Sequence, residues 1–95
     1  MKHLNKSVEK VAAILGSQYT LILIDEEWCL YRDLGNGYDI EINLGGTRGE
    51  AINASVRVWQ VRGKLKVTEV INNIREVDTL ERILKGVIYR TKLIA

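Results

Sequence analysis

Two strand-like runs joined by a Gly-Asn-Gly turn at residues 35–37 restrict the fold of this chain more than any other feature. Glycine and asparagine tolerate the positive φ angles that a tight hairpin turn requires. After the turn, apolar and polar residues alternate from Tyr38 to Leu44, as in a strand with one buried and one exposed face. Residues 28–44 therefore predict a β-hairpin, and the rest of the chain must pack on the sheet that it begins.

The register of this hairpin depends on the length of its turn. A three-residue turn places Leu30 opposite Ile42. It also sets Asp33 against Asp39, where two carboxylates repel, whereas a two-residue turn would pair Arg32 with an acid but expose Leu30. Burying a large apolar side chain is worth about 1.5–3 kcal/mol, and a cross-strand charge pair only about 0.2–1 kcal/mol. We therefore expect the three-residue turn, with the repulsion partly screened at an exposed end.

A helix and a strand are predicted before the hairpin. Residues 4–15 carry apolar side chains at three- and four-residue spacing, which indicates an amphipathic helix. Gly16 follows and suits the left-handed conformation that ends many helices. The next run, TLILI at residues 20–24, is short and continuously apolar, which is typical of a strand covered on both faces. We therefore expect this strand to lie centrally in the sheet.

A second hairpin is predicted further along the chain. Alternation at residues 54–61 and 64–71, about a turn at Arg62 and Gly63, indicates two more strands. Pairing about this turn would place Trp59 near Lys66 and Arg57 near Thr68. Residues 67–77 also fit helical spacing, but their β-branched side chains and the pair Asn72-Asn73 within them favour a strand and then a loop.

A second amphipathic helix is predicted at residues 78–90, where apolar residues again recur at helical spacing. Asp78 and Glu81 have the spacing of a capping box, with aspartate in place of serine or threonine. Residues 91–95 are expected to fray. The predicted order is α-β-β-β-β-β-α, a single α+β domain over residues 1–95, with an antiparallel meander of about five strands and a helix at each end.

Catalytic and cofactor motifs are absent from the sequence. His3 is the lone histidine and Cys29 the lone cysteine, so a nucleophile–histidine pair or a tetrahedral metal site lacks its ligands. The glycine-rich residues 45–53 fit neither a Walker loop nor a dinucleotide fingerprint, and a flexible connection is expected there. Asp39 and Glu41 share one strand face, but an open sheet face does not shift a pKa toward catalysis. We expect no enzyme, no cofactor and no metal.

Charge is divided between the two hairpins. Residues 25–41 hold six acids and one cation, whereas residues 57–66 hold four cations and no acid, so the net charge of +2 conceals two opposed surfaces. The predicted partner-binding residues are an aromatic ring among cations. They are Arg57, Trp59, Arg62, Lys64 and Lys66.

Three interpretations of these residues remain open from the sequence. Trp and Arg are common anchors of protein interfaces, which favours a small non-enzymatic protein-binding module whose partner is another protein. Stacking on an aromatic ring among cations would also suit a weak single-stranded nucleic-acid binder. Alternatively, Trp59 is part of the core under a helix, with the cations extending from its edge.

Location and assembly are predicted only in outline. No apolar run has the length of a membrane span, and the N-terminal residues lack the apolar segment of a signal peptide, so a cytoplasmic protein without a membrane partner is expected. An open five-stranded sheet has two edges, and a homodimer through an edge strand is a further arrangement that the sequence allows.

Overall fold

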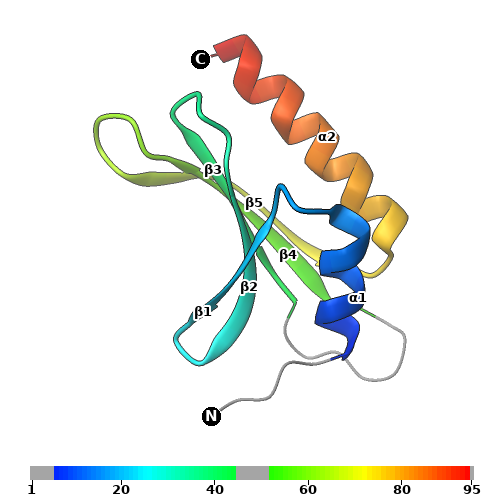
Figure 1. The fold of residues 1–95 in the computed structure, drawn as a ribbon. Coiled ribbons are helices and arrows are strands. Elements are labelled where there is room, and N and C mark those ends of the chain that lie inside the picture. The colour runs from blue at the N-terminus through cyan, green and yellow to red at the C-terminus, as the bar shows by residue number, and fades with distance from the viewer. Residues whose placement is uncertain (1–5, 45–51, 95) are drawn as a thin grey trace.

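The computed structural model describes residues 6–44 and 52–94, and these form a helix, five antiparallel strands and a second helix (Figure 1). The sheet is a meander in which strand order follows sequence order. The predicted α+β architecture is therefore confirmed. The elements are α1 (Lys6–Leu15), β1 (Thr20–Ile24), β2 (Glu27–Asp33), β3 (Tyr38–Asn43), β4 (Ala54–Gln60), β5 (Lys66–Ile74) and α2 (Val77–Ile94).

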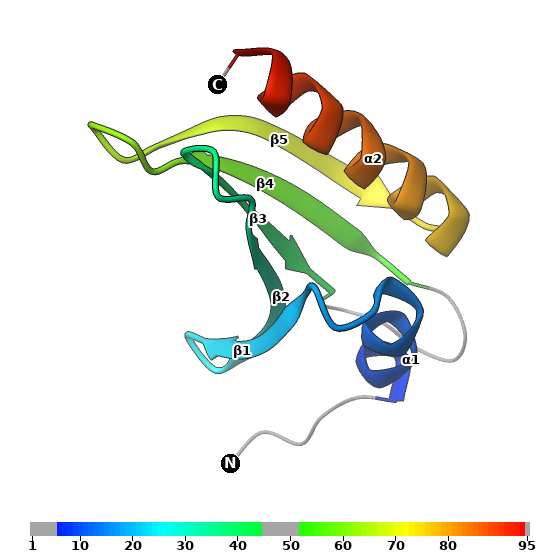
Figure 2. The same ribbon diagram turned by 45° about the horizontal axis from the view of Figure 1, so that its top comes forward.

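Both helices cover the same face of the sheet (Figures 1 and 2). Val8 and Val11 of α1, like Leu80, Leu84 and Val87 of α2, are buried in one hydrophobic cluster with the sheet. The strands contribute alternate residues to this cluster, so one side of the pleat is dry and the other is not. The central sheet residues of the cluster are Leu30, Ile40, Ile42, Val56 and Val58.

The β2–β3 hairpin has the three-residue turn that was predicted. Leu30 pairs with Ile42, and Asp33 pairs with Asp39. The expected screening by solvent holds for Asp33, which is exposed, but not for Asp39, which is 7% exposed. The two carboxylates take different hydrogen-bond donors. Asp33 accepts a hydrogen bond of 2.8 Å from the backbone N–H of Gly35, and Asp39 accepts one from the hydroxyl of Tyr31.

Helix α1 agrees with the prediction over the described residues. Gly16 follows the helix with a φ of +89°, and its N–H donates to the carbonyl of Ala12 at 3.0 Å. This is the left-handed helix end that the sequence indicated, in a conformation that favours glycine. Leu4, the first residue of the predicted stripe, lies outside the described residues.

Helix α2 is longer than predicted at both ends. It begins at Val77, so Asp78 is not the N-cap but lies in the first turn, where a carboxylate favours the helix dipole. It continues to Ile94 instead of fraying after Arg90. Thr91 is the reason, because its buried hydroxyl donates to the carbonyl of Ile88 at 3.0 Å and accepts from Asn36 Nδ2 at 3.3 Å. The β2–β3 turn therefore holds the last turns of this helix.

The prediction of a central, doubly covered β1 was wrong. β1 lies at one edge of the sheet and, among the residues that the structure describes, pairs only with β2. Leu23 is 48% exposed and Ile24 is 38% exposed. A continuous apolar run does not distinguish an edge strand from a central one, because the meander, and not the composition of the strand, sets its place.

Candidate interaction surface

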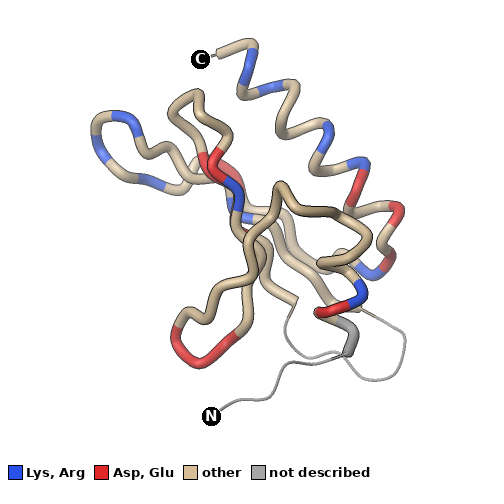
Figure 3. Tube along the Cα trace, viewed as in Figure 1, with Lys and Arg blue, Asp and Glu red and all other residues tan. Residues whose placement is uncertain are grey.

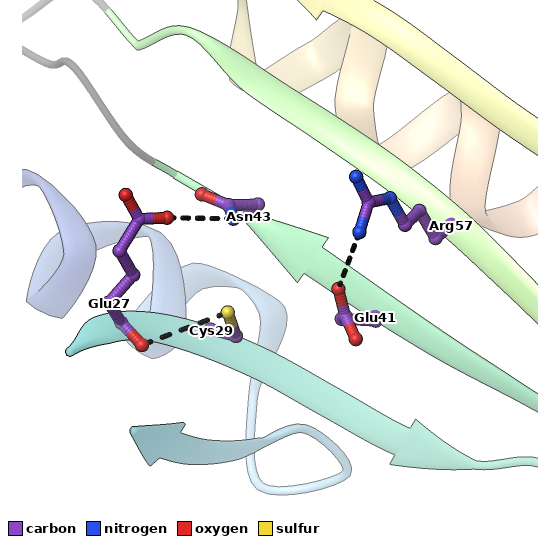
Figure 4. Close-up of polar contacts among 5 residues, drawn as sticks. All are labelled: Glu27, Cys29, Glu41, Asn43 and Arg57. Carbon is purple, nitrogen blue, oxygen red and sulfur yellow. Dashed lines mark hydrogen bonds and ion pairs between the residues drawn. The ribbon is translucent and has the colours of Figure 1, made fainter. Parts of the chain in front are cut away.

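The sheet face that the helices leave uncovered is called here the open face. It carries the residues that alternate with the buried ones along each strand. Figure 4 shows Cys29, Glu41 and Arg57 on this side, with helix α2 behind the sheet. The open face is made by Ile22, Cys29, Tyr31, Asp39, Glu41, Arg57, Trp59, Val67 and Val70.

Tyr31 and Asp39 form the most buried polar pair of the open face. The Tyr31 hydroxyl donates to Asp39 Oδ2, and Asp39 is only 7% exposed. This hydrogen bond, with burial as the second cause, raises the pKa of Tyr31 to about 12. Asp39 Oδ1 is buried and has no hydrogen-bond partner among the described residues. The Tyr31 hydroxyl is therefore the one donor that satisfies this carboxylate in the described part of the chain.

Trp59 lies on the open face, so the interpretation of this ring as core under a helix is wrong. It pairs with Asp39 of β3 on one side and with Val67 of β5 on the other. The ring is therefore half-buried between an acidic and an apolar neighbour.

The predicted pairing of Trp59 with Lys66 was also wrong. Lys66 pairs with Gln60, which puts its side chain on the opposite face from Trp59. Arg57 pairs with Val70 instead of lying near Thr68. The cause is a register shift between Val58 and Trp59, where β5 contains one extra residue. A bulge of this kind reverses the alternation beyond it, and a count of residues from the turn cannot detect it.

Arg57 is the cation that shares the open face with Trp59. Its guanidinium lies 3.8 Å from Glu41 Oε2 across the β3–β4 pair, and its side chain is 53% exposed. An ion pair this long and this exposed contributes little to stability. About half of the Arg57 side chain is therefore available to another molecule.

The remaining predicted cations lie in and next to the β4–β5 turn. Arg62 and Lys64 are exposed there, and Lys66 opens β5. The β1–β2 turn carries Asp25 and Glu26, so one end of the sheet is acidic and another is basic (Figure 3). The predicted site therefore divides into an aromatic–arginine pair on the open face and a basic turn beyond it.

Cys29 is a buried thiol on the open face. It is 2% exposed, and its Sγ lies 3.9 Å from the carbonyl of Glu27. Burial raises the pKa of this thiol, and the nearby carboxylates of Glu41 and Glu27 raise it further. In this environment Cys29 acts as a small buried packing residue.

We expect the Cys29 thiol to react with a chromogenic disulfide reagent far more slowly in the folded protein than in urea at neutral pH. Burial excludes the reagent, and a raised pKa leaves little thiolate to attack it. Cys29 is the lone cysteine, so the absorbance change reports this thiol alone. Equal rates in the two conditions would contradict the buried environment.

Two clefts were not predicted. A polar cleft of about 570 Å³ opens at one end of the sheet, near a second irregularity of β5 where Asn73 has a φ of +61°. β5 continues through Asn72 and Asn73, which were predicted to lie in a loop. The sequence feature that could have indicated this cleft is the set of asparagines at or next to the ends of β3, β4 and β5. The cleft is lined by Glu27, Asn43, Asn53, Ala54, Ser55, Asn72 and Asn73.

A smaller cleft of about 310 Å³ lies between α1, α2 and the loop that follows α1. Its wall is mainly apolar, with Arg32 and Lys85 at its margin. The Arg32 guanidinium lies 5.4 Å from the centre of the Tyr19 ring, at cation–π distance. Apolar residues of both helices supply most of the remaining wall, and Gln18 and Glu81 add polar groups to it. The lining comes from several segments, so no single stretch of sequence indicated this cleft.

Among the described residues, no group of three or more histidine, cysteine or acidic side chains is placed to hold a metal ion. Neither described helix combines the length and the apolar content that crossing a membrane would require. His3 and the glycine-rich residues 45–51 lie outside the described residues. Comparisons with known protein families, curated proteins and solved structures found no significant match to this chain.

Proposed function

We propose that this protein is a small non-enzymatic module that binds another protein through its open face. The supporting observation is the position of Trp59 and Arg57, which lie next to each other on β4, on the face that neither helix covers. Tryptophan and arginine carry much of the binding energy at protein interfaces, and a rigid sheet fixes their backbone positions, which lowers the ordering cost of binding. The location in the cytoplasm that the sequence predicts remains part of this proposal.

The charges of the open face favour a protein over a nucleic acid. Trp59 lies beside Asp39, and Arg57 is paired with Glu41, so each anchor has an acidic neighbour. A phosphate backbone would be repelled by these carboxylates, whereas a protein surface can place its own cations against them. The basic β4–β5 turn alone is a small footprint for nucleic acid, and Lys66 does not share a face with Trp59.

The titratable groups of the open face also favour binding over catalysis. The pKa of Tyr31, raised to about 12, lies further from neutral pH than that of an ordinary tyrosine, and the raised pKa of Cys29 disfavours the thiolate. General acid–base and nucleophilic catalysis instead need groups whose pKa lies near the working pH or is lowered.

The test compares Trp59→Ala with Tyr89→Ala as matched baits in lysate of the source cell. Both substitutions remove one aromatic ring, but Tyr89 is an exposed residue of α2, away from the open face. The wild type and Tyr89→Ala should retain the same stoichiometric protein, and Trp59→Ala should lose about tenfold or more of it, as expected for an interface anchor. Circular dichroism must show that Trp59→Ala is folded.

Nuclease treatment separates the two classes of partner. Retention that survives nuclease supports a protein partner. Retention that disappears with nuclease, and that falls steeply with salt, would instead support the nucleic-acid alternative. If Trp59→Ala and the wild type capture the same amount of this protein, the open face is not the binding surface.

A further inference from the structure

Within residues 6–44 and 52–94, the outer edge of β1 lacks the protection that sheet edges usually have. In this part of the chain β1 pairs only with β2, and residues 20–24 contain no charge, proline or glycine. Natural proteins block an exposed edge with charges, prolines or bulges, because its unpaired N–H and C=O groups accept another strand. The opposite edge, β5, is blocked in this way by two register shifts and by the charged residues Lys66 and Glu69.

The β1–β2 turn determines which backbone groups of β1 face outward. Asp25 and Glu26 have φ angles of 49° and 65°, so they form a two-residue hairpin turn closed by the pair Ile24 and Glu27. Hydrogen-bonded pairs then alternate along the ladder, and Ile24 and Ile22 direct their N–H and C=O groups toward β2. Leu21 and Leu23 direct theirs away from the sheet.

We propose that β1 pairs antiparallel with β1 of a second copy, about a two-fold axis through Ile22, to give a homodimer with one continuous sheet. In this register Leu21 of one copy lies opposite Leu23 of the other. Both residues have outward backbone groups, so each such pair exchanges both N–H···O bonds. The side chains that meet are Leu with Leu, Ile with Ile and Thr20 with Ile24, and no like charges face each other.

Charge complementarity at both ends of this pairing favours a second copy over an unrelated strand. The register places Asp25 of one copy opposite Tyr19 of the other. The Arg32 guanidinium lies over the Tyr19 ring, 5.4 Å from the ring centre. Arg32 has no ion pair among the described residues. Arg32 pairs with Ile40 on the face that the helices cover, the face to which Leu21 also belongs. In the proposed register, the β1–β2 turn of the second copy brings Asp25 to the end of β1 next to Tyr19, so that its carboxylate can approach this cation. The two-fold symmetry repeats the contact at the other end.

The dimer also has a consequence for the open face. A two-fold axis perpendicular to the sheet puts the helices of both copies on one side and both open faces on the other. The dimer would thus present two equivalent binding surfaces in one plane, which raises avidity for a repeated or dimeric partner. Dimerisation uses the β1 edge and not Trp59. The dimer can therefore fail while the proposed function stands, and the proposed function can fail while the dimer stands.

The experiment is sedimentation equilibrium of the purified protein over a range of concentrations. The wild type is expected to approach twice the chain mass of 10.8 kDa as concentration rises. Leu23→Pro removes an N–H that no strand of the same copy uses, and Leu23→Lys places a charge in the pairing; each should remain a monomer. Leu65→Lys changes an apolar residue of comparable exposure in the β4–β5 turn and should dimerise like the wild type.

Asp25→Lys tests the register, because it places two cations together at each end of the pairing. Its dimer is expected to dissociate about tenfold more readily, as for like charges brought together at an interface. Circular dichroism and thermal unfolding show whether each variant is folded. A wild type that stays at the mass of one chain at every concentration overturns the proposal. A folded Leu23→Pro that still dimerises, or a Leu65→Lys that does not, overturns the choice of β1.

Discussion

Replacing Ile42 with alanine is expected to lower the free energy of unfolding by about 2–5 kcal/mol, the range for truncating a fully buried isoleucine. Ile42 is fully buried, and it lies between Leu30 and Val56 in adjacent strands, under the two helices. The alanine leaves a cavity that the sheet backbone cannot close, because the strands on both sides hold its register. Urea unfolding followed by circular dichroism measures the loss.

Val70→Ala is the matched control for this prediction. Val70 is a β-branched residue of the same sheet, but it lies on the open face and is 50% exposed. Its truncation should cost about 0.5 kcal/mol or less, as for most surface substitutions. Comparable losses for the two variants would contradict the assignment of the covered and open faces, and with it the position of the proposed interface.

Tyr31→Phe is expected to have the second largest effect, a loss of about 1–3 kcal/mol of unfolding free energy at neutral pH, the usual cost of leaving a buried acceptor unpaired. The Tyr31 hydroxyl is the donor to Asp39 Oδ2, and Asp39 Oδ1 already lacks a partner among the described residues. The substitution removes one oxygen atom and leaves the ring in place. Urea unfolding of the two proteins at the same pH measures the difference.

The hydrogen bond between Tyr31 and Asp39 also makes the free energy of unfolding fall as the pH becomes alkaline. The pKa of Tyr31 is raised to about 12 in the folded protein, whereas it is about 10 in an unfolded chain. Because the folded state holds the proton more tightly, this stabilisation is complete below about pH 10 and is lost as the pH rises from there through about 12. The wild type should therefore lose more stability than Tyr31→Phe across this interval.

Tyr89→Phe is the control for the alkaline measurement. Tyr89 is exposed on α2, and its substitution should leave both the neutral stability and the alkaline loss unchanged. If Tyr31→Phe and the wild type lose stability in parallel as the pH rises, the Tyr31 hydroxyl does not hold its proton through Asp39.

Local patterns in the sequence determined the element types and one register. Alternation about the turn at residues 35–37 predicted the pairing of Leu30 with Ile42, because a one-residue slip would expose every apolar residue of the strand. Helical spacing predicted both helices, and Gly16 predicted the end of the first. These features depend on neighbouring residues along the chain, so the sequence alone is sufficient to find them.

The tertiary structure decided which face is covered, which strand is at the edge and where the second helix ends. Thr91 extends α2 because it meets Asn36, a residue far from it in sequence. The extra residue in β5 moves Lys66 away from Trp59 and places Val67 beside the ring, and the β3–β4 register places Asp39 on its other side. β1 is exposed because the meander puts it last in the sheet. Each outcome depends on contacts between distant segments, and a periodic pattern carries no information about which segment lies opposite.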